Sequence, residues 1–225
     1  MINLTWYGHS SLGLETGLNK LLVDPYFTDN PAASTTADNV SGDYILVTHG
    51  HNDHVGDTVG IAKRSGAIAI SNMEVAIWLE KQGLDAQGLS FGEARSYPFG
   101  TVELTHAVHG NRLPDGSEAG EPGGFVLSLD GKKIYIAGDT GLFDGMAQIG
   151  RQGLDWAILP IGGFYTMDPD QALQAVKMLA PRQVIPYHFN TWDKIQQDPN
   201  AWAARVEKET TAKVHVMKPG ERLTL

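Results

Sequence analysis

The residues best suited to chemistry lie in one short segment that reads Thr-His-Gly-His-Asn-Asp-His. It holds His49, His51, Asp53 and His54 within six positions. Three imidazoles and a carboxylate supply the nitrogen and oxygen ligands that suit Zn²⁺ or a similar first-row metal. Because such groups repel one another when protonated, we prefer a metal site to the alternative, a polar solvated turn. A pair of metal ions here would predict hydrolytic chemistry.

The spacing of these side chains fits the backbone expected to carry them. The cluster follows an apolar run that predicts a buried β-strand. In extended chain, residues i and i+2 point the same way, so His49 and His51 can converge on one ion. The residues that follow, 55–62, predict the start of a helix. The change of direction there would let Asp53 and His54 face a second ion.

Size and composition favour an ordinary globular protein. We expect one domain over residues 1–225, because single α/β domains commonly reach this length. The absence of cysteine excludes disulfide bonds and thiolate ligands. The amino terminus lacks the layout of a signal peptide, and no stretch approaches the roughly 20 apolar residues of a membrane span. These features predict a cytoplasmic protein with no membrane partner.

The charge balance bears on the kind of partner. Two divalent ions would add four positive charges to a net charge of −9, which leaves −5. An acidic protein of this kind is not steered toward long nucleic acids, so we expect none as a partner. A small-molecule substrate is the expected partner, and an anionic one would have to be attracted locally by the metal ions.

Strand-like and helical patterns alternate along the chain. Strand-like runs fall at Asn3–Tyr7, Ser11–Thr16, Lys20–Val23, Tyr44–Val47, Ala67–Ser71, Thr101–Ala107, Phe125–Leu129, Lys133–Ala137, Asp155–Pro160, Gln183–Tyr187 and Lys213–Met217. Asp168, Pro169 and Gln171 predict a capped helix start, and Asp198-Pro199 begins the last helix similarly. Strand clusters in both halves, each followed by helices, suggest two sheets packed face to face with helices outside.

Two connections are unusually long, at Tyr26–Asp43 and Gly110–Gly124. Loops longer than about 12–15 residues are usually functional or disordered. The second loop begins directly after His109, so we expect it to cover the substrate. Arg112 within it is a candidate for gripping a substrate anion, although a lone loop arginine is usually only solvated.

Three further residues of ligand type stand at the ends of strand-like runs. His109 and His188 lie at loop junctions, and Asp139 ends the apolar run Ile134–Gly138. Each is a weak signal by itself, because a histidine or aspartate at a strand end is more often hydrogen-bonded than bound to metal. Their meaning depends on whether they join the cluster.

Taken together, these motifs resemble the metallo-β-lactamase superfamily. The residues that carry the resemblance are His-x-His-x-Asp-His, then His109, Gly-Asp139-Thr140 and Pro186-Tyr187-His188. Trp6–Ser11, Val23–Pro25 and Leu159–Gly163 are similar to an uncharacterised subgroup close to the ascorbate-phosphate lactonase branch. The resemblance implies an α/β fold, a four-layer αββα sandwich with metals at one edge of the paired sheets.

The resemblance also implies an assignment of ligands to two divalent ions. His49, His51 and His109 would hold the first ion, while the second would be held by Asp53, His54 and His188. Asp139 would bridge both. Zinc is the expected metal, with manganese or iron as alternatives, because nitrogen and oxygen ligands accept all three.

Other polar residues receive supporting roles in this interpretation. Asp24, beyond the run Leu21–Val23, would accept a proton from a ligand imidazole and fix its tautomer, unless it only begins a turn before Pro25. His9 is a candidate proton donor or a buried, hydrogen-bonded histidine. His106 is expected at the surface or behind the ligands, and His215 in a structural role.

The function predicted is therefore a metal-dependent hydrolase. Two ions about 3.5–4 Å apart would activate a shared water, which would attack an ester, lactone or phosphodiester bond of a small, possibly anionic substrate. Asp53 would orient that water or carry its proton. The alternatives are a non-catalytic metal-binding module and, less favoured, a diiron oxidoreductase, whose relatives carry a glutamate where this chain has His51.

Overall fold

The computed structural model describes all residues from 1 to 225. Two seven-stranded sheets form its centre. The first has the order β14-β1-β2-β3-β4-β5-β6, with β1 Asn3–Gly8, β2 Ser11–Glu15, β3 Lys20–Val23, β4 Tyr44–Leu46, β5 Ile68–Asn72, β6 Ala86–Leu89 and β14 Arg222–Thr224. The second has the order β13-β12-β11-β10-β9-β8-β7, with β7 Ala94–Tyr97, β8 Gly100–His106, β9 Gly123–Leu129, β10 Lys132–Ile136, β11 Trp156–Pro160, β12 Gln183–Tyr187 and β13 Lys213–Val214.

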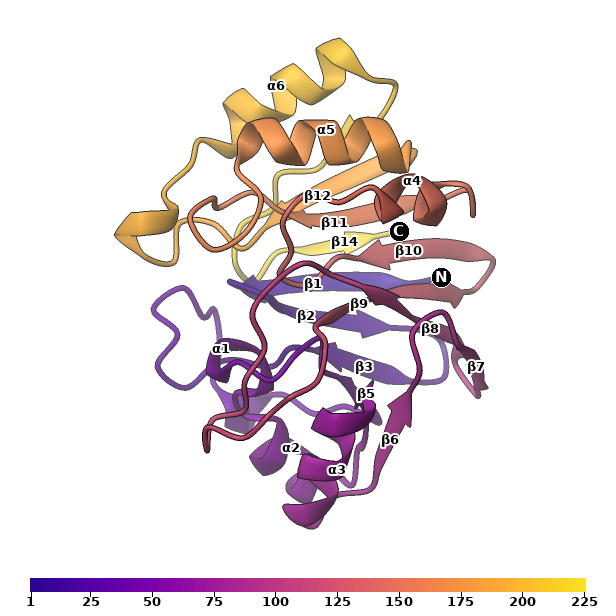
Figure 1. The fold of residues 1–225 in the computed structure, drawn as a ribbon, viewed down its shortest axis with the longest axis vertical. Helices are drawn as coiled ribbons and strands as arrows, with labels where there is room; N and C mark the ends of the chain where they lie inside the picture. The colour runs from indigo at the N-terminus through magenta and orange to yellow at the C-terminus, as the bar shows by residue number, and fades with distance from the viewer.

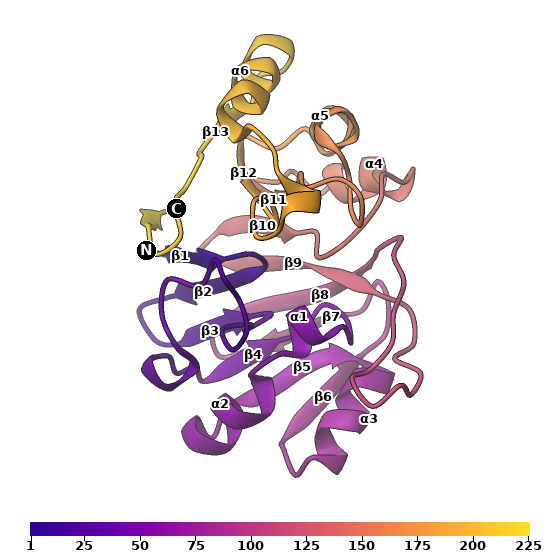
Figure 2. The same cartoon turned by 90° about the vertical axis from the view of Figure 1, so that its left-hand side faces the viewer.

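Helices cover the outer face of each sheet. They are α1 Asn52–Val55, α2 Thr58–Ser65, α3 Met73–Lys81, α4 Gly145–Gly150, α5 Pro169–Leu179 and α6 Pro199–Glu209, with short 3₁₀ turns at Ala37–Asn39 and Asp193–Ile195. Figures 1 and 2 show α2 and α3 against the first sheet and α4, α5 and α6 against the second. Four layers result, so the predicted αββα sandwich is confirmed.

Strand β4 illustrates how the sequence produces these layers. Side chains alternate along a strand, so Tyr44 and Leu46 enter the core between the two sheets, whereas Ile45 packs in the cluster under α2 and α3. All three are buried, as expected for a strand with parallel neighbours and both faces covered. The uninterrupted apolar run therefore encodes the central position of β4.

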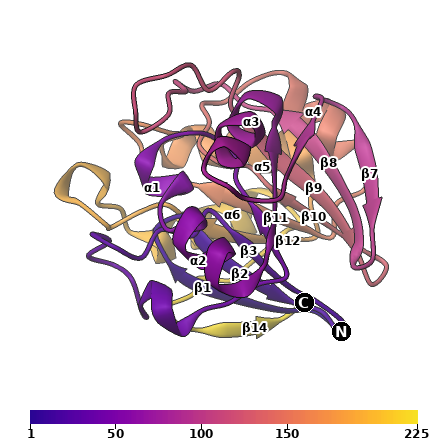
Figure 3. The same ribbon diagram turned by 90° about the horizontal axis from the view of Figure 1, so that it is seen from below.

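The same arrangement sends the ends of several strands to one edge. Strands β3, β4 and β5 run parallel in the first sheet, and β10, β11 and β12 run parallel in the second. Parallel strands end at the same edge, where ligands bind in open α/β sheets. In the view from below, α2 and α3 lie across the first sheet and the two chain termini lie together beside β14 (Figure 3).

The structure also differs from the expected elements. Strands β6, β7 and β14 and helices α3 and α4 were not predicted, and the last predicted strand, Lys213–Met217, is reduced to the two residues of β13. The helix expected over 55–62 is divided into α1 and α2 at Gly56, whose φ is +38°. A Cβ there would lie 2.6 Å from the carbonyl oxygen of Pro25, so this close approach needs glycine.

The loop Gly110–Gly124 was expected to cover the substrate, but none of its residues lines the cavity beside His51 and Asp53. Its apolar side chains Leu113 and Ala119 are buried in the cluster under α2 and α3. Asn72, which caps α3, donates hydrogen bonds to the carbonyls of Ala119 and Glu121, both at 2.7 Å. These contacts fix the loop against the first sheet. Separately, none of the helices is long and apolar enough to span a membrane.

The capping box of α5 provides a test of local stability. The Asp168 side chain accepts a hydrogen bond from the amide of Gln171 at 2.8 Å, and the Gln171 side-chain oxygen accepts one from the Asp168 amide at 3.3 Å. We expect Asp168→Ala to lower the free energy of unfolding by about 1 kcal/mol and Tm by roughly 2–4 °C. Gln171→Ala, the matched control, keeps the cap and should cost less. Equal melting curves for Asp168→Ala and the unaltered protein would contradict this role.

Candidate metal centre

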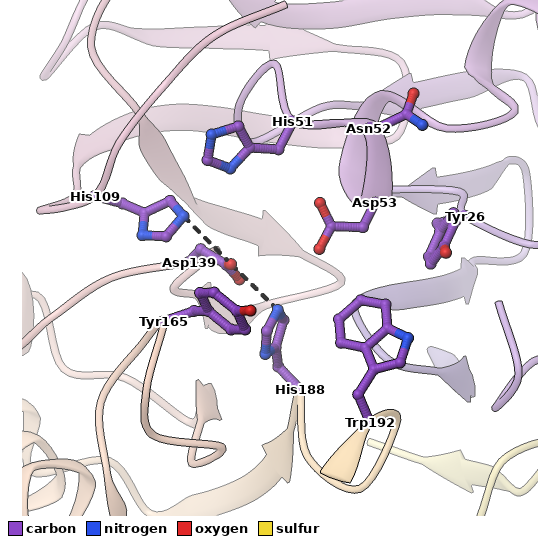
Figure 4. Close-up of a pocket in the computed structure, with 9 residues that line it drawn as sticks. All are labelled: Tyr26, His51, Asn52, Asp53, His109, Asp139, Tyr165, His188 and Trp192. Atoms are coloured by element: carbon purple, nitrogen blue, oxygen red, sulfur yellow. Dashed lines mark ion pairs between the residues drawn. The ribbon is translucent and has the colours of Figure 1, made fainter. Parts of the chain in front are cut away.

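The predicted ligands come together at the edge where the strands end. They follow β4, lie in α1, or stand just after β8, β10 and β12: His49, His51, Asp53, His54, His109, Asp139 and His188. Figure 4 shows five of them, with His51 and Asp53 on one side of a cavity, His188 on the other, and Asp139 behind. Two sheets therefore contribute to one site.

His49, His51 and His109 form one group whose nitrogens all lie within 4.8 Å of one another. His49 Nε2 is 3.0 Å from His51 Nδ1. The ring of His109 lies edge-on to both, at centroid distances of 5.2 Å and 5.1 Å. Three imidazoles that face a common point match the ligand set of a zinc or similar ion.

Asp53, His54 and His188 form a second group, which also includes His9. The carboxylate of Asp139 lies between the two groups. Its oxygens are 3.3 Å from His54 Nε2, 3.1 Å from His188 Nε2 and 3.6 Å from His109 Nε2. This intermediate position is the one that a bridging carboxylate requires.

Several buried polar atoms of this site have no hydrogen-bond partner. They are His54 Nε2, Asp139 Oδ1 and both ring nitrogens of His188. Buried polar atoms are almost always hydrogen-bonded, because leaving one unsatisfied costs about 1–3 kcal/mol. The two nitrogens Nε2 and the carboxylate oxygen face one another instead of a protein donor. The residues present therefore fit bound metal ions.

Asp24 organises the imidazoles from behind. It is fully buried, and its two oxygens accept hydrogen bonds from the Thr48 amide at 2.8 Å, the Thr48 hydroxyl at 2.7 Å and His54 Nδ1 at 2.8 Å. Because the Thr48 hydroxyl gives its only proton to Asp24, it accepts from His49 Nδ1, which is 3.0 Å away. In their neutral forms both imidazoles would therefore direct the Nε2 lone pair into the site.

Burial and neighbouring charges perturb the titration of this cluster. Burial and the neighbouring imidazoles lower the pKa of His49 well below its usual value. Burial would lower the pKa of His54 too, but the carboxylates of Asp139 and Asp24 raise it well above normal. For Asp139, burial is outweighed by His188 and His54, and its pKa falls well below normal. The raised pKa favours a protonated His54 beside the ionised carboxylate when no cation is bound, and a bound cation would take the place of that proton.

His9 supports Asp53 from the opposite side. Its Nε2 is 3.2 Å from Asp53 Oδ2, and its Nδ1 is 2.8 Å from the Thr191 hydroxyl. Burial, together with the nearby His188, lowers the pKa of His9 to about 3, so the ring is neutral. A neutral ring has one donor, and Asp53 can only accept, so Nε2 donates to Asp53 while Nδ1 accepts from Thr191.

Five of the candidate ligands line a cavity of about 450 Å³. Its nine lining residues are Tyr26, His51, Asn52, Asp53, His109, Asp139, Tyr165, His188 and Trp192 (Figure 4). Sequence reasoning did not find Tyr26, Asn52, Tyr165 or Trp192. Two of them did carry a signal, since Asn52 lies inside the histidine motif and Trp192 follows the candidate ligand His188 by four residues.

Three other predicted residues lie away from the cavity. The Arg112 guanidinium donates to the carbonyl of Gly116 at 3.1 Å within its own loop, and Arg112 does not line the cavity. His106 is exposed on β8 and stacks on Phe91. His215 contacts the Gln183 side chain at 2.7 Å, in agreement with a structural role.

Comparison with known proteins agrees with this fold and with a metal-dependent hydrolase. The profile of the Beta-lactamase superfamily domain matches residues 19–189. Similar proteins include a UPF0173 metal-dependent hydrolase of Heliobacterium modesticaldum, 45% identical over all of this chain and 98% of the relative. The UPF0173 metal-dependent hydrolase TTHA1283 of Thermus thermophilus is 41% identical, with both chains fully covered.

A solved structure supports the same conclusion. Igni18, described as a novel metallo hydrolase from the archaeon Ignicoccus hospitalis, superposes with a TM-score of 0.91 at 39% identity, covering 100% of this chain and 98% of Igni18. Fold and site thus define a metallo-hydrolase. The chain belongs to the β-lactamase superfamily and, within it, to the UPF0173 metal-dependent hydrolases. None of these three relatives is named a lactonase, so the narrower likeness to the lactonase branch stays a prediction.

His51 tests the metal assignment because its side chain serves the first group of ligands alone. We expect about two metal ions per chain in the unaltered protein and a loss of about one in His51→Ala. Elemental analysis of the purified proteins measures this directly. His106→Ala is the matched control, since His106 lies outside the site and should leave the metal content unchanged. An unchanged content in His51→Ala would remove His51 from the site.

Asp24 tests the support behind the ligands. In Asp24→Asn, one side-chain oxygen becomes an amide donor that must face a donor of Thr48 or His54. We expect metal affinity to fall about 10- to 100-fold, measured by competition with a chelator. Asp57→Asn is the control, because Asp57 likewise accepts several hydrogen bonds, from Phe27 and Thr28, away from the ligands. If both variants bind metal normally, Asp24 has no positioning role.

Proposed function

We propose that this protein is a dinuclear metal hydrolase that cleaves an ester, lactone or phosphodiester bond of a small molecule. The observation that carries the proposal is the set of unpartnered buried atoms His54 Nε2, Asp139 Oδ1 and His188 Nε2. Asp139 and His188 also line the cavity. Without a cation, burying these three polar atoms together with no hydrogen-bond partner would be energetically costly. Zinc is the metal we expect, with manganese or iron as alternatives.

The ligands would divide between two ions. His49, His51 and His109 would hold one, Asp53, His54 and His188 would hold the other, and Asp139 would join them. When bound, such a pair lowers the pKa of water and polarises the oxygen of the bond to be cleaved. This proposal explains why the two histidine groups stand on either side of one carboxylate.

The chain itself contributes proton handling through Asp53. Its side chain is one-quarter exposed toward the cavity, while His9 donates to Oδ2. The other oxygen would hold the ion through one lone pair and, through its second, orient a water molecule and accept its proton as the water oxygen bonds to the electrophilic carbon or phosphorus. The same proton then passes to the oxygen that leaves as the bond breaks, so no serine or cysteine nucleophile is needed.

His9 holds Asp53 in place for this transfer. Because His9 is wholly buried and neutral, it keeps the Asp53 carboxylate ionised without competing for the proton. The Thr191 hydroxyl donates a hydrogen bond to His9 Nδ1, so the ring carries its proton on Nε2 and has a single tautomer. His9 acts as a positioning residue in this proposal and is separated from the cavity by Asp53 and Trp192.

A panel of small esters, lactones and phosphodiesters tests the activity on the metal-loaded protein. We expect turnover of at least one class, its loss on chelation and its recovery when metal is restored. Asp53→Asn should lower kcat by roughly 10²- to 10⁴-fold, because proton transfer contributes about that much. Asp57→Asn, away from the site, is the matched control and should retain activity.

The alternatives give different results in the same experiment. No turnover of any class, with both ions confirmed by elemental analysis, would favour a non-catalytic metal-binding module. A coloured, iron-loaded protein that consumes oxygen would favour the diiron oxidoreductase. Either result would overturn the hydrolase proposal while leaving the metal centre itself intact.

A further inference from the structure

We propose, on the basis of the proposed function, that the substrate is an uncharged ester or lactone bearing a flat apolar group, which packs against Trp192 and Tyr165. This narrows the substrate from the possibly anionic molecule expected from the sequence. The inference rests on the composition of the cavity wall, on how that wall is held, and on where the basic side chains lie.

The wall opposite His51 and Asp53 is aromatic. Tyr165 and Trp192 lie along that side of the cavity, and Tyr26 closes the end beside Asp53 (Figure 4). The Tyr26 hydroxyl donates to the Asp29 carbonyl at 2.8 Å, so its polar end is already occupied. Tyr165 is 46% exposed and lines the cavity, so its ring is accessible to a bound molecule.

The two loops that carry these rings are held in position. Trp192 packs edge-on against the buried His9, with centroids 4.6 Å apart. Tyr165 follows Phe164, which adopts the left-handed φ of +59°, a strained conformation for an aromatic residue. This turn is tied down where the Met167 amide donates to the Thr140 carbonyl at 2.9 Å. This hydrogen bond holds the strained turn in place and therefore keeps Tyr165 at the cavity.

Contacts between the loops also reduce the cost of binding. Gln197 donates from Nε2 to the Gly162 carbonyl at 2.9 Å, and Lys194 Nζ lies 4.7 Å from the centre of the Phe164 ring. A wall ordered before binding loses little entropy when a ligand arrives. Flat groups gain most from such a wall, because aromatic pairs contribute about 0.5–1.5 kcal/mol beyond the area they bury.

The positions of the basic side chains disfavour an anionic substrate group. No lysine or arginine is among the nine residues that line the cavity. Arg112 is committed to its own loop, and Lys194 lies over the Phe164 face instead of toward the metal site. The charged lining groups apart from the histidines are the carboxylates Asp53 and Asp139. A carboxylate or phosphate reaching past the metals would meet no cationic side chain.

Hydroxamates, which share one metal-chelating head group, test this inference by binding alone. We expect the zinc-loaded protein to bind benzohydroxamate at least about fivefold more tightly than cyclohexanecarbohydroxamate, which is apolar but not flat. Succinic monohydroxamate, which carries a carboxylate, should bind no more tightly than acetohydroxamate. Isothermal titration calorimetry gives the four dissociation constants without any turnover.

Variants assign the preference to the wall. Tyr165→Ala and Trp192→Ala should each bring the ratio of the dissociation constants of cyclohexanecarbohydroxamate and benzohydroxamate closer to one. Trp192→Phe should keep the ratio of the unaltered protein. Trp78→Ala, on the distant helix α3, is the control and should leave all four constants unchanged. Tyr165→Ala keeps the test valid if Trp192→Ala does not fold, since Tyr165 is half-exposed on a loop.

The outcomes separate this inference from the hydrolase proposal. Tighter binding of succinic monohydroxamate, or a benzohydroxamate preference unchanged in Tyr165→Ala, would overturn the inference even if hydrolysis is observed. The expected binding pattern in a protein that turns over no ester, lactone or phosphodiester would support the aromatic wall and overturn the hydrolase proposal instead.

Discussion

The fully buried carboxylate of Asp24 is the constraint on which the site depends. Removing a charge from water is costly unless hydrogen bonds replace the lost solvation, and Asp24 receives them from Thr48 and His54. Those bonds also settle which nitrogen of His54 and, through Thr48, of His49 carries the proton. A single buried ion therefore turns two imidazoles, which could adopt either tautomer, into ligands with one defined orientation.

Backbone strain at the strand ends complements this network. His9, Asp24 and His188 all have positive φ, at 53°, 45° and 54°, although none is glycine. Each follows a strand of the sandwich, so the chain turns sharply there and directs a polar side chain into the edge between the sheets. Such conformations cost of order 1–3 kcal/mol each, and the packed sheets supply the stability that maintains them. The free energy gained by packing the core between the sheets therefore offsets the strain at this edge.

The sequence predicted the parts of the structure that obey local rules. Apolar runs such as Tyr44–Val47 located the central strands, and the histidine motif located the site, because both depend on residue type and short spacing. Strand β6 was missed since Ala86 and Gly88 have little strand preference, and β7 since it is a mostly exposed edge strand. Helix α3 carried a usable signal in the Asn72 cap and the buried Val75, Ala76 and Leu79. The roles of Tyr165 and Trp192 have no local signal, because only tertiary folding places them opposite the ligands.

The sheets position the candidate metal ligands and the loops position the aromatic wall, which explains how one scaffold can bind different substrates. All the donors that fit metal ions stand at or within a few residues of strand ends, or in the short helix α1, where the sandwich fixes their geometry. The aromatic wall, by contrast, comes from loops after β11 and β12 whose positions rest on a few hydrogen bonds and ring contacts. Loops tolerate substitution better than strands do. Changes in residues 162–166 or 190–197 would therefore alter which molecule is held while the Asp24 network and the ligand set stay the same.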